Sequence, residues 1–314
     1  MKSPFIYSDD NKRYYTYNCF LRRNFGSKVF KVSLNASMTC PNRDGTKGVG
    51  GCSFCSESGS GDFAGDPAQS IMSQFDTVRN KLHTKWPHAV YIPYFQAGSN
   101  TYSSVNKLWE LYESALSLKN VVGLSIATRP DCINDEIAEL LWEISKKTFL
   151  TVELGLQTIH DETAFYTNRC HTYSEFLHGY ELLSLRGINI CVHVINGLPF
   201  ETHEMMLATI KEVARLHPHS VKIHLLHIIK GTRLCHDFEA GKFSELSLEE
   251  YVKIVCDQLE LLPPEVIVQR LTGDGNKATL VAPLWSMKKF CVINEIDKEL
   301  ARRNAVQGES TIAR

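Results

Sequence analysis

Three cysteines in one glycine-rich loop are the residues of this 314-residue chain whose spacing points most directly to chemistry. Cys40, Cys52 and Cys55 occur in CPNRDGTKGVGGCSFC, with eleven residues between the first two and two residues between the last pair. Four glycines in this loop let the backbone wrap closely around a bulky group. The pattern predicts a metal or cluster site that is held by three thiolates.

Three thiolates suit some metal groups better than others. A structural zinc ion normally takes four protein ligands, whereas three thiolates on a [4Fe–4S] cluster leave one iron without a protein ligand. That iron is open to the amino and carboxylate groups of a methionine-like molecule. Zinc, a redox-active Cys-x2-Cys pair and a chance grouping are the alternatives. The other seven cysteines are scattered singly, and we expect most of them to be small buried hydrophobes.

Composition narrows the class of protein. Formal net charge is −1, but residues 1–31 carry seven Lys or Arg against two Asp, so any attraction for nucleic acid would have to be local. No apolar run reaches the roughly 18–20 residues that a membrane span needs, and the N-terminus lacks the apolar stretch of a signal peptide. We therefore expect no membrane span, a cytoplasmic location, and cysteines that are free or metal-bound.

Apolar runs alternate with amphipathic stretches from residue 28 onward, which predicts strand–helix units. Near-continuous apolar strands are typical of a parallel sheet covered by helices. Polar and glycine clusters follow nearly every strand, as they do at the active-site face of a barrel, so a closed or partly open barrel is favoured over a doubly wound sheet. The expected strands are Val29–Leu34, Ala89–Phe95, Val121–Thr128, Phe149–Leu156, Ile188–Ile195, Ser220–Ile229 and Val266–Leu271. The expected helices are Ser70–Leu82, Val105–Leu118, Asp135–Lys146, Tyr173–Arg186, Glu204–Leu216 and Leu248–Leu262.

The cysteine loop resembles that of the radical S-adenosylmethionine (SAM) superfamily, including the aromatic Phe54 before the last cysteine. TRPDC (Thr128–Cys132) and NRCHTY (Asn168–Tyr173) resemble the corresponding stretches of YhcC/YtqA-like proteins, relatives of the elongator-type radical SAM domain. This resemblance implies an α/β fold, a partial (β/α)6-type TIM barrel. It also implies two cofactors, a [4Fe–4S] cluster on Cys40, Cys52 and Cys55, and SAM.

The same resemblance suggests how the chain is divided. We expect a basic, aromatic N-terminal arm over residues 1–27 and a radical SAM core over residues 28–232. Residues 233–314 would form a C-terminal extension that completes or caps the barrel.

Residues that follow the strands are expected to bind SAM. FQAGSNTY stands where the superfamily usually has Gly-Gly-Glu, and its backbone would hold the methionine amino group. A guanidinium in NRCHTY offers two parallel donors to the methionine carboxylate, and NGLPFET should approach the adenosine. A carboxylate in the apolar strand ELGLQT needs a partner if it is buried, and could bind ribose or substrate. The expected SAM-binding residues are Phe54, Gly98, Ser99, Glu153, Gln157, Arg169, Asn196 and Gly197.

Two histidines raise a separate question. His224 and His227 lie three residues apart in one expected strand. Residues at that spacing point to opposite faces of a strand, so at most one is expected to face the barrel interior, and they are not expected to share a metal.

The resemblance implies a reaction and a substrate. An electron from a donor such as flavodoxin or ferredoxin would pass through the cluster to SAM, giving methionine and a 5′-deoxyadenosyl radical. The expected substrate is tRNA, at the carbon-5 side chain of the wobble uridine, of the glycine-derived aminomethyl type. Basic groups interleaved with aromatic ones in the N-terminal arm suit RNA contact. A protein or metabolite substrate, or a non-catalytic zinc or iron–sulfur module, are the alternatives, and the oligomeric state is left open. The candidate substrate contacts are Arg22, Arg23, Arg129, Arg270 and Asp274.

Overall fold

The computed structural model describes residues 5–59 and 61–312. The strands are β1 (Val29–Leu34), β2 (Val90–Phe95), β3 (Gly123–Thr128), β4 (Phe149–Gln157), β5 (Asn189–Asn196), β6 (Ser220–Leu225), β7 (Ile228–Ile229), β8 (Ile267–Arg270) and β9 (Leu280–Ala282). The helices are α1 (Tyr17–Phe25), α2 (Ile71–His83), α3 (Val105–Leu116), α4 (Asp135–Ser145), α5 (Asp161–Tyr166), α6 (Tyr173–Ser184), α7 (His203–Leu216), α8 (Arg233–Glu239), α9 (Leu248–Leu261), α10 (Lys289–Arg303) and α11 (Glu309–Ile312), with short 3-10 turns at Pro130–Cys132 and Leu284–Met287.

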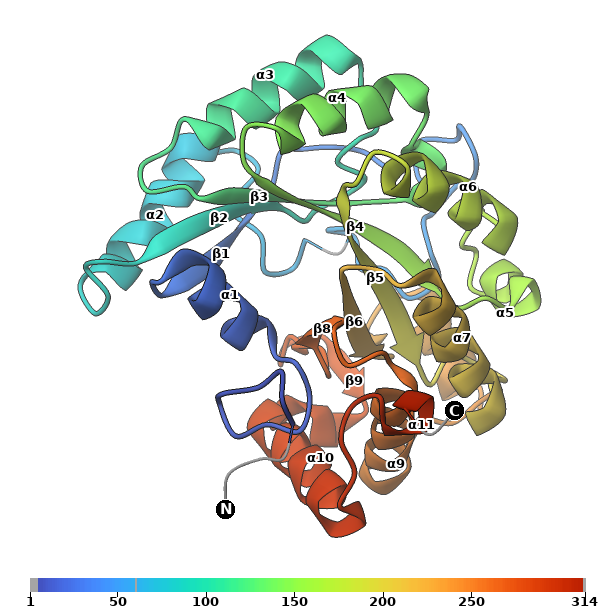
Figure 1. Ribbon diagram of the computed structural model, residues 1–314. Coiled ribbons are helices and arrows are strands. Elements are labelled where there is room, and N and C mark those ends of the chain that lie inside the picture. The colour runs from blue at the N-terminus through green and yellow to red at the C-terminus, as the bar shows by residue number, and fades with distance from the viewer. Residues whose placement is uncertain (1–4, 60, 313–314) are drawn as a thin grey trace.

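Seven parallel strands form one curled sheet in the order β1-β2-β3-β4-β5-β6-β8 (Figure 1). The order follows the chain because each strand returns to the next through a crossover, and parallel strands need such connections. The two edge strands, β1 and β8, do not pair with each other. The sheet is therefore a partial barrel, and the predicted α/β radical SAM barrel is confirmed.

Helices cover the outer face of this sheet (Figure 1). Helix α4 illustrates the reason, since Ile137, Leu141 and Ile144 recur at helical spacing and are all buried. Asn134 caps this helix by accepting a hydrogen bond from the Ile137 backbone N–H at 2.9 Å. The apolar stripe of such helices packs on the strands as one large core, and this core holds the strand ends rigidly.

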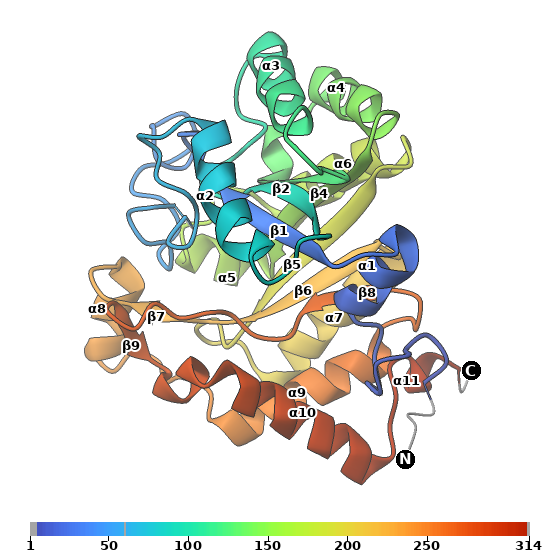
Figure 2. The same ribbon diagram turned by 90° about the vertical axis from the view of Figure 1, so that its left-hand side faces the viewer.

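The N-terminal segment closes one end of the half-barrel, a role that the sequence pattern did not predict. Phe20 of α1 packs edge-on against His219 and contacts Phe149, the first residue of β4. The Val268 N–H of β8 donates to the Tyr15 carbonyl at 2.8 Å, and Thr16 forms a parallel bridge with Val268. Figure 2 places α1 at the opposite end of the strands from the loop between β1 and α2.

The sixth predicted strand is shorter than expected. Strand β6 ends at Leu225, and β7 pairs antiparallel with β9 in a separate small sheet. The predicted domain boundary between Thr232 and Arg233 falls just after β7, and β8 beyond it joins the main sheet, so these domain limits stay a prediction. Among the described residues, no helix is both long and apolar enough to cross a membrane.

Candidate functional site

The cysteine loop lies at the carboxyl ends of the strands, directly after β1 (Figure 2). The carbonyl of Cys40 accepts hydrogen bonds from the next turn of the loop, at 2.7 Å from the Arg43 N–H. The loop following β2 supports it from behind, because the Ser99 N–H donates to the Thr39 carbonyl at 3.0 Å. Gly98 has φ +76, and a side chain there would overlap the Met38 carbonyl. A glycine is thus required where these two loops touch.

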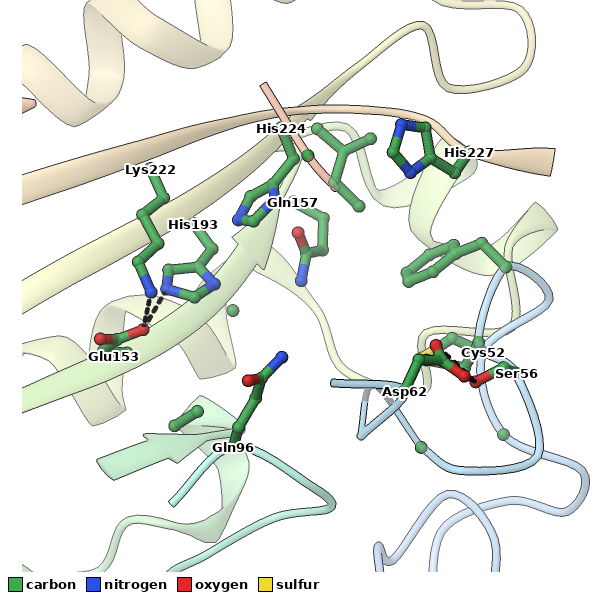
Figure 3. Close-up of a pocket in the computed structure, with 18 of the residues that line it drawn as sticks. Cys52, Ser56, Asp62, Gln96, Glu153, Gln157, His193, Lys222, His224 and His227 are labelled. Atoms are coloured by element: carbon green, nitrogen blue, oxygen red, sulfur yellow. Dashed lines mark hydrogen bonds and ion pairs between the residues drawn. The ribbon is translucent and has the colours of Figure 1, made fainter. Parts of the chain in front are cut away.

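The three cysteines line one cavity of about 300 Å³ at this end of the sheet (Figure 3). Its volume is at the lower end of the range for small-molecule sites. Most of the site residues expected from the sequence line the same cavity: Cys40, Cys52, Phe54, Cys55, Gly98, Ser99, Arg129, Glu153, Gln157, Arg169, Arg270 and Asp274.

Arg169 connects the cysteine loop with β4. Its Nη1 donates to the Sγ of Cys52 at 3.5 Å and its Nη2 to the Gly155 carbonyl, while its Nε has no hydrogen-bond partner among the described residues. The Cys55 thiol, then Arg169 and Arg129, hold the pKa of the Cys52 thiol well below its usual value against the effect of burial. A thiolate is the form that binds metal, so these contacts favour a metal-binding state of Cys52.

Arg129 positions the segment that carries Arg169. It donates to both oxygens of Asp131, at 2.9 and 2.8 Å, and to the carbonyls of Arg169 and Cys170, at 2.9 and 3.2 Å. Arg129 is 3% exposed, and its donors are largely taken up by protein atoms. It lines the cavity, but its contacts make it a support for Arg169.

Strand β4 is shaped to leave room for Arg169. A Cβ on Gly155 would lie 2.6 Å from Nη2 of Arg169 and 2.9 Å from Nε2 of Gln157. The register with β5 shifts between Gly155 and Gln157, and Gln157 has φ +72. Such bulges re-aim side chains near active sites. Here the bulge turns Gln157 into the cavity, where its Oε1 has no hydrogen-bond partner among the described residues (Figure 3).

Glu153 lies at the opposite side of the cavity from Cys52 (Figure 3). Its carboxylate is fully buried and binds Lys31, Lys222 and the Nε2 of His193 (2.8 Å), and accepts a bond from Ser125 (3.2 Å). Burial would raise the pKa of this carboxyl, but the two lysines hold it well below the usual value. A carboxylate accepts about four hydrogen bonds, so the protein itself occupies the oxygens that were expected to bind ribose or substrate.

His224 and His227 both line the cavity, so the expectation that at most one faces the interior is wrong. The reason is the end of β6 at Leu225, since the chain no longer alternates faces beyond that point. His227 then packs against the loop after β8, where a Cβ on Gly273 would lie 2.9 Å from its Cε1. The ring nitrogens Nε2 of both histidines lack a hydrogen-bond partner in the described structure.

Two groups of expected residues lie outside the cavity. The Asn196 amide exchanges hydrogen bonds of 2.8 Å with Gln258 of α9, and Gly197 faces Leu246. Arg22 and Arg23 are exposed on α1, at the closed end of the barrel, where both bind Asp9. These four residues are not brought together with the cysteines, and their expected roles stay predictions.

Sequence reasoning missed Lys31, His193 and Lys222, which surround Glu153. The same signal that identified Glu153 was present for them, because each is a polar residue inside an otherwise apolar strand. A buried charge needs a partner, so charged residues in neighbouring strands should have been considered as a set.

The donor set fits an iron–sulfur cluster. Every one of the ten cysteines is a free thiol, and three of them meet at one cavity beside a buried arginine. Within the described residues, no three or more His, Cys, Asp or Glu side chains are grouped so as to hold a single metal ion. A [4Fe–4S] cluster has a different requirement, because each of its thiolate ligands binds a different iron.

Comparisons with known proteins agree with this geometry. The family model of the radical SAM superfamily matches residues 39–213, and that of the radical SAM C-terminal domain matches residues 218–302. YtqA of Bacillus subtilis is 50% identical over 307 residues, which is 98% of this chain and 95% of YtqA.

Two further comparisons give lower sequence identities. The tRNA uridine(34) acetyltransferase of Methanocaldococcus jannaschii is 31% identical over 157 residues, which is 49% of this chain and 28% of that protein. The solved structure of Methanocaldococcus infernus Elp3 superposes with a TM-score of 0.69 at 20% identity, covering 90% of this chain and 64% of that chain. The latter likeness shows the fold.

Proposed function

The chain belongs to the radical SAM superfamily, and from that membership we propose that it is a radical SAM enzyme that modifies the carbon-5 side chain of a tRNA wobble uridine. Membership gives the two cofactors, a [4Fe–4S] cluster and SAM. Together, when bound, they supply a one-electron cleavage of SAM that yields a hydrogen-abstracting 5′-deoxyadenosyl radical.

In this proposal Cys40, Cys52 and Cys55 hold the cluster. The observation that carries it is that thiols far apart in a sixteen-residue loop all line one cavity, and that Arg169 contacts one of them at 3.5 Å. Loops after β1 and β2 hold this arrangement through backbone hydrogen bonds. The thiolates therefore need no large rearrangement to bind a cluster.

Arg169 is proposed to bind the SAM carboxylate. Its place beside Cys52 puts a guanidinium next to the proposed cluster, and its Nε is a donor without a partner among the described residues. Gly98 and Ser99 would present backbone groups to the methionine amino group, and Phe54 and Gln157 would flank the bound molecule. Asn196 and Gly197 have no geometric support for this role.

An exposed aromatic surface supports the RNA part of the proposal. Phe165 is 88% exposed and Phe200 is 62% exposed with φ +66. Tyr166 follows Phe165 in α5, with its ring 5.0 Å from that of Phe200 and with Arg233 over its face at 5.9 Å. We call Phe165, Tyr166, Phe200 and Arg233 the aromatic rim. Tyr166 and Phe54 pack on the same small core, so the rim lies at the cavity end of the strands, where bases could stack.

The choice of uridine rests on relatives. A relative that matches 49% of the chain is named tRNA uridine(34) acetyltransferase, and position 34 is the wobble position. The glycine-derived aminomethyl type of side chain rests on the resemblance to the YhcC/YtqA group alone. We also propose a flavodoxin or ferredoxin as the electron donor, and a cytoplasmic location, which the ten free thiols support.

The decisive experiment compares modified nucleosides in tRNA from wild-type and deletion strains by mass spectrometry. We expect one wobble-uridine nucleoside to disappear, its precursor to accumulate, and the wild-type gene but not a Cys52→Ala gene to restore it. An unchanged wobble-uridine profile would transfer the proposal to a protein or metabolite substrate.

A binding experiment tests the aromatic rim directly. Replacing Phe165 and Phe200 together with Ser should weaken tRNA binding by about tenfold or more, since stacking of one base contributes about 1–3 kcal/mol. The matched control replaces Arg22 and Arg23 with Ala at the closed end of the barrel, where the sequence also predicts RNA contact, and the two losses of tRNA affinity are compared. Stronger loss in the control would place the RNA on α1 and refute the rim.

A further inference from the structure

A charged group at the side of the cavity opposite Cys52 is called the floor cluster here: Lys31, Glu153, His193 and Lys222. Glu153, His193 and Lys222 line the cavity, and Lys31 joins them through its ion pair with Glu153. Two ammonium groups share one carboxylate there, and Lys222 is 7% exposed at its side chain. The Tyr94 ring lies against both ammonium groups, at 4.2 Å from Lys31 and 4.7 Å from Lys222. A tyrosine ring face attracts cations but does not neutralise them.

A second carboxylate near this end of the cavity is shared in the same way. Arg270 lines the cavity near Lys222 and pairs with Asp274 at 3.4 Å, but Lys289 also binds Asp274 at 2.9 Å. Glu153 and Asp274 are thus each shared by two cations, and of these four cations Lys222 and Arg270 line the cavity.

The neighbouring imidazoles do not remove this excess. Burial, followed by Lys222, lowers the pKa of His193 to about 4, and burial followed by His193 lowers the pKa of His224. Both rings are thus neutral at physiological pH, and each carries one N–H donor.

Three residues that line the cavity each carry a buried polar atom without a hydrogen-bond partner among the described residues. These atoms are the Nε2 of His224, the Nε2 of His227 and the Oε1 of Gln157. A buried polar atom without a partner lowers the stability of the folded protein. Uncompensated buried cations cost more. Both observations indicate that a polar ligand with negative charge completes this part of the cavity.

We infer that the floor cluster is a subsite for a carboxylate group of the substrate, with Lys222 as its ionic partner and Arg270 and His224 as hydrogen-bond donors. The inference rests on the proposed function, because it specifies which group of the substrate enters that cavity. Glu153 is a positioning residue here, since it holds Lys222 and His193 and has no free oxygen for the ligand. The SAM carboxylate is assigned to Arg169, which contacts Cys52, and Figure 3 shows Cys52 at the opposite side of the cavity from Glu153.

Equilibrium binding to the reconstituted, SAM-loaded enzyme tests the subsite. The probes are two anticodon stem-loop RNAs that differ only at the wobble base, one with 5-carboxymethylaminomethyluridine and one with the same nucleoside in which a carboxamide replaces the carboxylate. We expect the carboxylate probe to bind about tenfold tighter or more, the effect of a charge-assisted hydrogen bond. Lys222→Gln should abolish this preference without changing SAM binding, while Lys298→Gln on α10 should preserve it.

Three outcomes overturn the inference: equal binding of the two probes, an unchanged preference in Lys222→Gln, or loss of SAM binding in that variant. If Lys222→Gln does not fold, Arg270→Gln on the cavity wall replaces it, and its preference should fall at least threefold. The free nucleosides are measured in the same way. If the enzyme prefers the carboxylate nucleoside but binds neither RNA, the subsite is supported and tRNA is rejected as the substrate. If it binds both RNAs equally well, the subsite is rejected and tRNA is supported.

Discussion

Gly155→Ala is the substitution that most directly tests how β4 positions Arg169. The new Cβ would lie 2.6 Å from Nη2 of Arg169 and 2.9 Å from Nε2 of Gln157. Real Cβ contacts are longer than this, so something must move. Both neighbours are the ends of flexible side chains, and the backbone can stay in place. Arg169 should therefore lose its hydrogen bond to the Gly155 carbonyl and its contact with Cys52.

Gly155→Ala should weaken SAM binding more than it lowers the stability of the fold. One charge-assisted hydrogen bond contributes about 1.5–3 kcal/mol, which corresponds to roughly a ten- to hundredfold weaker SAM affinity. Stability should change by less than about 1 kcal/mol, because no backbone atom is displaced. SAM binding to the cluster-loaded enzyme is measured at equilibrium, and stability by thermal unfolding. The loss of SAM affinity in Arg169→Ala gives the upper limit for the loss expected in Gly155→Ala.

A second strand glycine supplies the matched control. A Cβ on Gly123 would meet the Phe149 carbonyl at 2.7 Å, a backbone contact that cannot turn aside. Gly123→Ala should therefore lower stability and leave the SAM affinity of the folded protein unchanged. SAM binding within twofold of wild type in Gly155→Ala, combined with a large loss in Arg169→Ala, would refute the idea that Gly155 sets the position of the guanidinium. No loss in Arg169→Ala would remove that residue from the SAM site.

Two further predictions concern the cluster and acid stability. Cys40→Ala, Cys52→Ala and Cys55→Ala should each abolish cluster assembly because two thiolates hold a cubane poorly, whereas Cys256→Ala in the core should keep normal iron; full iron in the Cys52 variant would contradict the assignment. Burial lowers the pKa of His219 to about 4, so the unfolded chain binds the extra proton between about pH 6.5 and pH 4, and stability falls as the pH drops through that window. His219 lies between two aromatic rings, and His219→Phe should remove at most about 3 kcal/mol of this acid sensitivity. Urea unfolding at pH 7 and pH 4 measures the effect, and equal acid sensitivity in both proteins would contradict the prediction.

Local patterns were sufficient to predict the barrel and the cysteine loop. Strands such as FLTVELGL are apolar along their whole length, and the three cysteines lie within sixteen residues, so both signals are contained in short windows. Predicted strand boundaries were wrong where tertiary contacts determine the end of a strand. The apolar run from Ser220 to Ile229 looked like one strand, but β7 leaves β6 to pair with β9, more than fifty residues later in the chain.

The environment of Glu153 shows a second limit on what the sequence alone can predict. Its partners, Lys31 and Lys222, are 122 and 69 residues away in the sequence, and they meet only because the sheet curls. A single-strand pattern can indicate that a buried carboxylate needs a cation, but it cannot choose which one. The basic, aromatic surroundings of Arg22 and Arg23 suggest RNA contact, and that role stays a prediction. Phe20 of the same segment packs into the closed end of the barrel.

The pairing of Thr16 with Val268 has a consequence for the outer edge of the sheet. An open parallel sheet exposes unpaired N–H and C=O groups at its outer strands, and such edges invite pairing with other chains. Here the Tyr15 carbonyl accepts a hydrogen bond from the Val268 N–H, so the N-terminal segment covers this part of the β8 edge and keeps it from pairing with another chain. Removal of the first sixteen residues would therefore leave the cavity lining intact but turn a protected edge into a template for aggregation.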